Sequence, residues 1–133
     1  MWISSVWIAL GGAIGSVLRF WLAEAAALAF GNEFPWGTVI ANITGCFVIG
    51  FVATLTGPEG RVFAGTAARQ FLMIGICGGY TTFSSFSLQT LTMLQAGDGA
   101  KAAVNVAASV VLCLLAVWVG HATAAMLNQM NGA

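Results

Sequence analysis

The sequence predicts an all-α membrane protein with four transmembrane helices, the third of which is broken in the middle of the membrane. Of the 133 residues, 59% are apolar and 6% are charged, whereas soluble domains carry about 25% charged residues. Such a chain cannot cover a surface that faces water, so its natural solvent is lipid. The apolar runs show no strand-like alternation, and in lipid the choice is between helices and a closed barrel. We therefore expect one small helical bundle.

Loops rich in glycine, proline and charged residues divide the chain into four apolar segments. The segments cover residues 2–30, 36–55, 62–94 and 102–126, and together they form a single transmembrane domain, residues 1–133. Each reaches the ~20 residues that a helix needs to cross the hydrocarbon core. The start, "MWISSVW", lacks the positively charged region that opens a cleaved signal peptide, so the first segment is expected to stay in the mature protein.

The third segment is too long for a simple crossing. A helix of its length would span roughly 50 Å, whereas the hydrocarbon core is about 30 Å thick. The stretch "GICGGYTT" lies near its middle. Its glycines, Gly75, Gly78 and Gly79, are expected to weaken the helix, and Thr81 and Thr82 are expected to cap it again. Non-helical backbone at membrane depth is tolerated where protein or water covers it, so this break predicts an interface or a site.

The basic residues are balanced between the two sides of the membrane. Arg61 and Arg69 belong to one side, and Arg19 and Lys101 belong to the other. The positive-inside rule then has no bias to act on, so the chain is expected to insert both ways round. Four helices are also too few to enclose an aqueous pathway. The sequence thus predicts a dual-topology antiparallel homodimer in the plasma membrane, that is, in the inner membrane if the source is a Gram-negative bacterium.

Composition and spacing argue against several other classes of function. The formal net charge is zero, so no basic face indicates nucleic-acid binding. The carboxylates lie in loops or near a helix end, and no nucleophile–base pair, metal cluster or phosphate loop is present, so the chain is not expected to be an enzyme. The cysteines are far apart in the sequence and are expected to be buried, inert thiols. They are Cys46, Cys77 and Cys113.

Neutral polar residues do enter the predicted spans. Thr38 and Asn42 share a face of the second span, and Ser84, Ser85 and Ser87 follow the break. A further track on the fourth span has the spacing i, i+4, i+8 and consists of Asn105, Ser109 and Cys113. Such residues often join membrane helices by hydrogen bonds, which is the structural alternative to a role in a pathway.

Two phenylalanines, Phe83 and Phe86, share a face with the hydroxyl-rich turn "GGYTTFSSFS". Packing against lipid or core is the structural alternative for both. The functional interpretation rests on the ring quadrupole, because the edge of a phenyl ring is electropositive and can face an anion. With the amide of Asn42 and nearby hydroxyls, the rings would line a narrow path of hydrogen-bond donors without full charges. Such a path suits a small, hard anion that has to be dehydrated but not trapped.

The first span contributes the motif "GGAIGSVLRF". Gly11 and Gly15 are spaced for close contact between helices. Arg19 follows four residues later on the same face. Three roles remain open for this arginine: it extends to the membrane interface, it raises the local anion concentration, or it forms part of the dimer seam.

Together, "GGAIGSVLRF", "GTVIANITGCFVIG" and "GICGGYTTFSSFS" resemble the Fluc (CrcB) family of small fluoride channels in order and spacing. The four-span plan covers nearly the whole chain. The resemblance implies a passive, fluoride-selective channel that exports fluoride from the cytoplasm and relieves its toxicity. It also implies a dual-topology homodimer with two antiparallel pores and a structural sodium ion on the two-fold axis. Its partners would be fluoride, a second copy of the chain and the lipid bilayer.

Residue by residue, the resemblance assigns the fluoride pore to Phe83, Phe86, Asn42, Thr38, Ser109, Asn105 and Arg19. It assigns the sodium ion to the backbone carbonyls of Gly78 and Thr81. The chain departs from the family pattern at three positions. Ser85 stands where Thr is frequent, Tyr80 stands where an aliphatic residue is common, and Cys113 is a weak donor at a track position.

Two alternatives belong to other classes. A small dual-topology exporter of organic cations, similar to the small multidrug transporters, would share the size and charge balance of this chain. It would need a carboxylate inside the membrane, and the sequence places none at that depth. A helper subunit would use the same polar residues for assembly alone, and it would not transport ions as a purified protein.

Overall fold

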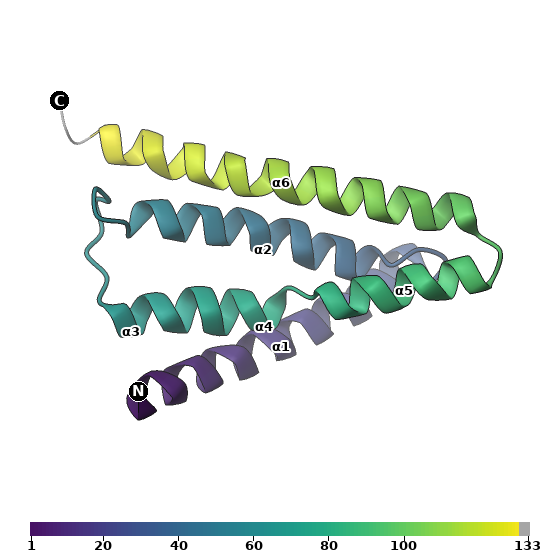
Figure 1. Ribbon diagram of the computed structural model, residues 1–133, viewed down its shortest axis with the longest axis horizontal. Helices are drawn as coiled ribbons and strands as arrows, with labels where there is room; N and C mark the ends of the chain where they lie inside the picture. Colours follow the sequence, from purple (N-terminus) through teal and green to yellow (C-terminus); the bar gives the residue numbers. More distant parts are fainter. Residues whose placement is uncertain (131–133) are drawn as a thin grey trace.

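A computed structural model describes residues 1–130, and its regular structure is helical throughout that range (Figure 1). Four helical runs are long and apolar enough to cross a membrane, as predicted. They are α1 (Trp2–Phe30), α2 (Trp36–Leu55), the bent run Thr66–Gln95, and α6 (Gly99–Gln129). The chain is therefore a multi-pass membrane protein.

The first two helices have the predicted bounds, whereas the third and fourth differ at their ends. The third run begins at Thr66 rather than at residue 62, because the backbone N–H of Val62 donates to the carbonyl of Leu55 (3.2 Å) and closes a loop. Arg69 also ties this loop down by donating to the carbonyl and the hydroxyl of Thr56. The fourth helix extends beyond the apolar segment at both ends, to Gly99 and Gln129.

The third run consists of two helical parts joined by an extended dipeptide. Its first part contains α3 (Thr66–Arg69), the π-helix η1 (Gln70–Cys77) and α4 (Gly78–Tyr80), and its second part is α5 (Phe83–Gln95). Between them Thr81 and Thr82 adopt extended conformations, with φ and ψ of −83° and 156° and of −154° and 118°. The predicted break in the third helix is thus confirmed.

The glycines of this region are not themselves the residues at which the helix is broken. Gly75, Gly78 and Gly79 all lie in helical turns. A Cβ atom on Gly75 would lie 2.9 Å from the Cα of Gly11, and one on Gly79 would lie 2.5 Å from the carbonyl oxygen of Gly12. These glycines therefore allow the third run to contact α1 directly, and the spacing of small residues on α1 serves this contact inside one chain.

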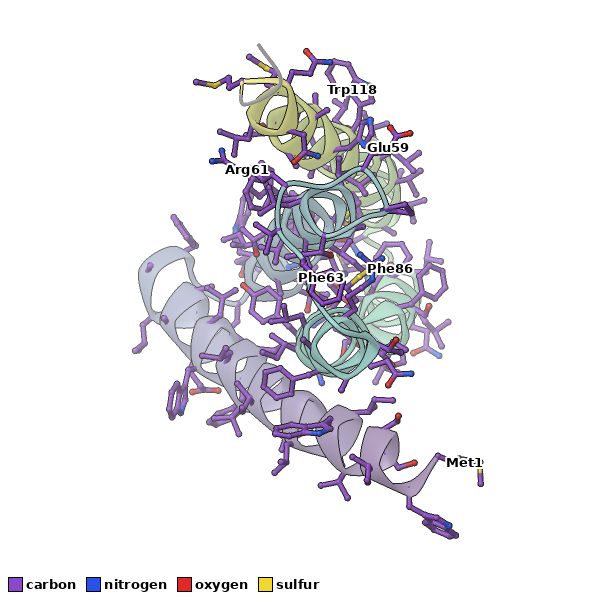
Figure 2. The ribbon with its side chains drawn as sticks, turned by 90° about the vertical axis from the view of Figure 1, so that its left-hand side faces the viewer. Met1, Glu59, Arg61, Phe63, Phe86 and Trp118 are labelled. Carbon is purple, nitrogen blue, oxygen red and sulfur yellow. The ribbon has the colours of Figure 1, made fainter. Side chains whose placement is uncertain are left out.

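The four runs are stacked side by side, and their direction alternates along the chain (Figure 1). Both termini of the described chain and the loop 56–65 lie at one end of the stack, so α1 and the third run point one way while α2 and α6 point the other. Seen from that end, α6, α2 and the third run lie one above another and α1 crosses below them (Figure 2). Glycines on α2 and α6 permit close contact, since a Cβ on Gly50 would lie 2.3 Å from the carbonyl of Val117.

The interior is built from small residues and the outer surface from large apolar ones. Ala41 and Ala124 are fully buried, while large side chains such as Trp118 on α6 project outward (Figure 2). This distribution is the reverse of that in a soluble bundle. It is expected in lipid, because burying a leucine side chain away from hydrocarbon gives no hydrophobic stabilisation. Membrane helices therefore associate through close backbone contacts, which small residues permit.

Candidate functional site

A groove of about 450 Å³ opens beside the helix break, between α2, the third run and α6. Phe86, labelled in Figure 2, lies on the part of the third run that follows the break. The groove is lined by Asn42, Gly45, Cys46, Ile49, Cys77, Gly78, Thr81, Thr82, Phe83, Phe86, Ser109, Val110, Cys113 and Leu114. The fold thus brings Asn42, Phe83, Phe86 and Ser109 together with Gly78 and Thr81, which come from three different predicted spans.

Phe83 and Phe86 form a tilted aromatic pair at the start of α5. Their ring centroids are 5.3 Å apart and the ring planes meet at 48°. Phe83 is 78% exposed, whereas Phe86 is only 9% exposed. The pair therefore connects the inside of the bundle with the open side of the groove, and Phe83 has little packing within its own chain.

Asn42 pairs with the backbone at the break. Its Nδ2 donates to the carbonyl of Thr82 (3.0 Å), and its Oδ1 accepts from the N–H of Thr82 (2.7 Å). The side-chain amide replaces the partners that a continuous helix would supply, which removes the cost of two unsatisfied backbone groups. One N–H of Nδ2 is used in this pair, and the amide has a second one to offer.

Thr82 is the N-cap of α5, as expected from sequence. Its hydroxyl oxygen accepts from the backbone N–H of Ser85 (3.1 Å), the interaction that stabilises the first turn of a helix. The capping bond and the bond to Asn42 have a further consequence. In an unbroken helix the N–H of Thr82 would donate to the carbonyl of Gly78, and the N–H of Ser85 would donate to that of Thr81. Both carbonyls have lost these donors.

Arg19 lies on the α1 side of the same break. Its guanidinium donates to the hydroxyl of Ser85 (3.5 Å), and Ser85 also contacts the hydroxyl of Thr82 (3.1 Å). The Nε atom of Arg19 is buried and has no hydrogen-bond partner among the described residues. A chain of polar contacts therefore runs from Arg19 through Ser85 and Thr82 to Asn42. Arg19 itself is not among the residues that line the groove.

Asn105 and Ser109 form a buried polar link between α6 and α5. Asn105 is 1% exposed and donates through Nδ2 to the hydroxyl of Thr90 (3.0 Å). The hydroxyl of Thr90 in turn donates to the carbonyl of Phe86 (2.8 Å), and Ser109 contacts Oδ1 of Asn105 at a long 3.5 Å. Asn105 therefore supports the turn that carries Phe86. Ser109, by contrast, lines the groove with a weakly held hydroxyl.

Thr38 does not lie in this groove. It is buried one turn before Asn42 and lines a second cavity of about 450 Å³ at the end of the bundle that contains the loop 31–35. Glu24 and Gln89 line the same cavity, and the Oε1 atom of Gln89 is buried without a hydrogen-bond partner among the described residues. The pore residues assigned from the sequence therefore do not share one cavity, because Thr38 lines the second one and Arg19 and Asn105 line neither.

Some contributing residues escaped the sequence analysis. Thr90 links Asn105 to Phe86, and the signal that could have found it is its i, i+4 spacing from Phe86. Thr44 on α2 forms a hydrogen bond with the hydroxyl of Tyr80 (2.9 Å). This contact gives the phenolic hydroxyl of Tyr80 a polar partner on the outer side of the bundle, where lipid would offer none.

Apart from Arg19 beside the break, the charged side chains lie toward the ends of the bundle. Lys101 contacts Glu33 (3.1 Å) and Asp98 (3.6 Å) at one end, and Arg61 and Arg69 bind backbone carbonyls at the other. The groove itself is lined by aromatic, amide, hydroxyl, thiol and aliphatic groups. Chemically it can offer hydrogen-bond donors and ring edges to a small anion, and its lining contains no Asp, Glu, Lys, Arg or His.

Comparisons with known proteins agree with this architecture. A family model described as "CrcB-like protein, Camphor Resistance (CrcB)" matches residues 6–121. A fluoride-specific ion channel FluC of Rhodospirillum rubrum is 59% identical over 124 residues, which are 93% of this chain and 96% of the relative. Proteins of the same name from Methylocella silvestris and Opitutus terrae are 55% and 56% identical, over 96% of this chain in each case and 98% and 96% of their own lengths. The matched region contains the whole groove.

Proposed function

Because this chain belongs to the CrcB family, we propose that it is a fluoride-selective, passive ion channel of the plasma membrane. It exports fluoride from the cytoplasm and so relieves fluoride toxicity. The observation that carries the proposal is the groove at the helix break, where two phenyl rings, an amide and a hydroxyl converge from three spans. The relatives that bear the name fluoride-specific ion channel match nearly the full chain.

The groove offers polar groups that can take the place of the water molecules that hydrate a fluoride ion. The second N–H of Asn42 and the weakly held hydroxyl of Ser109 are donors, and the edges of Phe83 and Phe86 carry partial positive charge. Each of these interactions is weaker than a full ion pair. An anion that meets several of them in succession can lose its water and still leave, which is the requirement for conduction.

Passive transport follows from the chemistry of the lining. A pump coupled to protons needs an ionisable group in the transport path. The lining of the groove contains no Asp, Glu, Lys, Arg or His among the described residues. This feature also argues against the small multidrug-type cation exporter, which would require a carboxylate there.

A second copy of the chain is the proposed cover of the groove. The groove is open and its walls are mainly apolar, and Phe83 stands 78% exposed beside it. By the sequence, Arg61 and Arg69 belong to one side of the membrane and Arg19 and Lys101 to the other, so the basic residues leave the orientation of the chain undecided. An antiparallel homodimer would cover the groove of each copy and complete one pathway on each side.

A structural sodium ion fits the break. The carbonyls of Gly78 and Thr81 have lost their helical donors to Asn42 and Thr82, and both residues line the groove. Hard monovalent cations accept such neutral oxygen ligands. Two copies of the chain would supply about four carbonyls to one ion, and the bound cation would supply fixed positive charge between the two anion pathways.

The remaining predicted pore residues receive different roles. Ser109 belongs to the groove, while Asn105 positions the turn of Phe86 through Thr90. Thr38 faces the second cavity and would meet the ion at the end of its path. Arg19 acts on the pathway through Ser85 and Thr82 and through its positive charge.

The test is fluoride efflux from liposomes that contain the purified protein. We expect flux that builds a membrane potential, continues without a proton gradient and discriminates strongly against chloride. Equal passage of chloride, or a requirement for a proton gradient, would contradict the proposal. The absence of flux from well-folded protein would favour the helper subunit.

A further inference from the structure

The hydroxyl of Ser109 is held differently from other hydroxyls in the spans. The hydroxyls of Thr44, Ser87 and Thr123 each donate to the backbone carbonyl four residues earlier, at 2.8–2.9 Å. Ser109 instead donates to the side-chain oxygen of Asn105, Oδ1, at a long 3.5 Å. Ser109 is buried within the chain and lines the groove beside the break. The proton of this hydroxyl is therefore weakly held and can turn toward an ion in the groove.

The acceptor that faces Ser109 is fixed by a count of protons. The hydroxyl of Thr90 carries one proton, and it donates that proton to the carbonyl of Phe86 (2.8 Å). Toward Asn105 this hydroxyl can therefore only accept, and it accepts from Nδ2 at 3.0 Å. The amide of Asn105 is thereby locked with its NH₂ group toward Thr90 and its oxygen toward Ser109. Asn105 itself is 1% exposed and lines neither of the two cavities described above.

We propose that Asn105 is a positioning residue that sets how tightly the groove holds fluoride, and that it acts through Ser109. Without an anion, the proton of Ser109 points to Oδ1 of Asn105. An arriving anion has to take this proton from the amide oxygen, so the lost hydrogen bond offsets part of the free energy of binding. The inference rests on the proposed function and deepens it, because it names the residue that limits the affinity for the ion.

The competition for the proton has a measurable consequence. An ion that is held too firmly leaves a conducting path slowly. A hydrogen bond between neutral groups changes an equilibrium constant by a factor of about two to ten. Loss of the competing oxygen of Asn105 should therefore lower the fluoride concentration at half-maximal efflux by about two- to tenfold and also lower the maximal rate. A purely structural role of Asn105 would lower the maximal rate alone.

Substitutions at two positions test the arrangement. Asn105→Leu removes the competing oxygen at similar volume. Thr90→Val removes the hydroxyl that locks the amide, so that Asn105 can turn its NH₂ group toward Ser109 and leave the serine proton free. Both variants should hold fluoride more tightly, whereas Thr90→Ser keeps the hydroxyl and should behave like the parent. Thr123→Val is the control, because it removes a hydroxyl from α6 that lies in neither cavity.

The experiment measures fluoride efflux from liposomes over a range of internal fluoride concentrations. Independently of transport, it also measures how NaF protects the detergent-solubilised protein from thermal unfolding, with NaCl at equal ionic strength as the reference. We expect a lower half-saturating concentration and stronger protection for Asn105→Leu and Thr90→Val. Ser109→Ala, which removes the donor, should bind fluoride more weakly than the parent. Added to Ser109→Ala, Asn105→Leu should change neither quantity further, because no proton is left to compete for.

Several outcomes would overturn the role of Asn105. One is a parental half-saturating concentration in both Asn105→Leu and Thr90→Val, and another is an effect of Asn105→Leu that persists undiminished beside Ser109→Ala. If Asn105→Leu does not fold, the comparison of Thr90→Val with Thr90→Ser decides, since only the valine lacks the hydroxyl. A parent that binds fluoride without conducting it would contradict the proposed function, and the order of the binding constants would still test Asn105. A parent that neither binds nor conducts fluoride would contradict both.

Discussion

Asn42 and Thr82, forty residues apart in the sequence, are joined by two hydrogen bonds between one side chain and one backbone unit. Nδ2 of Asn42 donates to the carbonyl of Thr82 at 3.0 Å, and the N–H of Thr82 donates to Oδ1 at 2.7 Å. The pair holds α2 against the break in the third run. The sequence predicts Asn42 as a hydrogen-bond donor to an anion. In the structure its side chain pairs with the backbone of Thr82 at the helix break.

Removal of this side chain tests both roles. Asn42→Ala would leave the N–H and the carbonyl of Thr82 without partners, and a buried unsatisfied group costs about 1–3 kcal/mol. We expect a lower free energy of unfolding and a strong loss of fluoride efflux. Thermal unfolding in detergent and liposome efflux provide the two measurements. Asn32→Ala, a change in an exposed loop, serves as the matched control for the free energy of unfolding. Unfolding of Asn42→Ala at the parent temperature would show that water replaces the amide at the break.

Two substitutions of Thr82, the N-cap of α5, distinguish the contribution of its hydroxyl group from that of its methyl group. Thr82→Ser keeps the oxygen that accepts from Ser85, whereas Thr82→Val keeps the shape of threonine and removes the oxygen. Loss of an N-cap costs about 0.5–2 kcal/mol, so the valine variant should unfold earlier while the serine variant behaves like the parent. Efflux should follow the same order, because the cap orients the turn that carries Phe83 and Phe86. Equal stability of the two variants would contradict a capping role.

The aromatic pair distinguishes packing from an electrostatic role. Phe83→Ile and Phe86→Ile should each cut fluoride efflux, because isoleucine has no electropositive ring edge. Their effects on stability should differ. Phe86 is buried, so its replacement is expected to cost about 1–3 kcal/mol, whereas Phe83 is 78% exposed and should cost little within the chain. Phe20→Ile on the outer face of α1 is the control, since Phe20 is 61% exposed and distant in sequence. If both pore variants conduct fluoride at the rate of the parent, the rings serve only in packing and their electrostatic role is contradicted.

Two adjacent glycines give opposite expectations for the same substitution. A Cβ on Gly79 would lie 2.5 Å from the carbonyl oxygen of Gly12, whereas a Cβ on Gly78 meets only the carbonyl oxygen of Met73, at 3.8 Å. Gly79→Ala should therefore separate the third run from α1 and destabilise the protein by roughly 1–3 kcal/mol. Gly78→Ala should be tolerated within the chain and even favour its helix by up to about 1 kcal/mol. The measurement is thermal unfolding of both variants, and equal destabilisation would refute the packing argument.

Gly78 also tests the proposed sodium ion. The chain itself has room for a Cβ atom there, so Gly78→Ala should keep the helix, and any harm that appears only with the larger Gly78→Leu would come from what lies beyond the Cβ, at the proposed dimer axis. We expect this variant to lose the stabilisation that sodium confers on the dimer, measured as the dimer fraction in sodium and in a bulky organic cation. Thr81→Ser should keep it, because the ligand is the backbone carbonyl and a serine hydroxyl can still donate to the carbonyl of Cys77. If the dimer fraction of the parent is the same in sodium and in the organic cation, the proposed structural sodium ion is contradicted.

Orientation in the membrane provides a test of the antiparallel dimer. Reporters of sidedness fused to the C-terminus should find both orientations in comparable amounts, since Arg61 and Arg69 oppose Arg19 and Lys101. Additional lysines in the loop 56–65 should bias insertion toward one orientation and lower the efflux per protein by depleting one kind of partner. A single orientation in the parent would contradict dual topology.

Much of the fold follows from the sequence because its determinants are local. Each apolar segment is bounded by its own loop residues, and the length of each is set by the thickness of the membrane. The break in the third helix could also be located, since Thr82 carries its own capping group to Ser85. The motifs around Gly11, Asn42 and Phe83 indicated the family for the same reason, because each is a contiguous stretch.

The tertiary structure decided what those residues touch. Gly75 and Gly79 had the composition of a helix break, yet they contact Gly11 and Gly12 of α1 within helical turns. No spacing rule connects Asn42 with the backbone of Thr82. Contacts of this kind depend on how rigid helices pack, and packing is determined by the shapes of surfaces that are far apart in sequence. By itself the sequence therefore determined the spans, the break and the residue types at the site, whereas their division between two cavities emerged only from the packed helices.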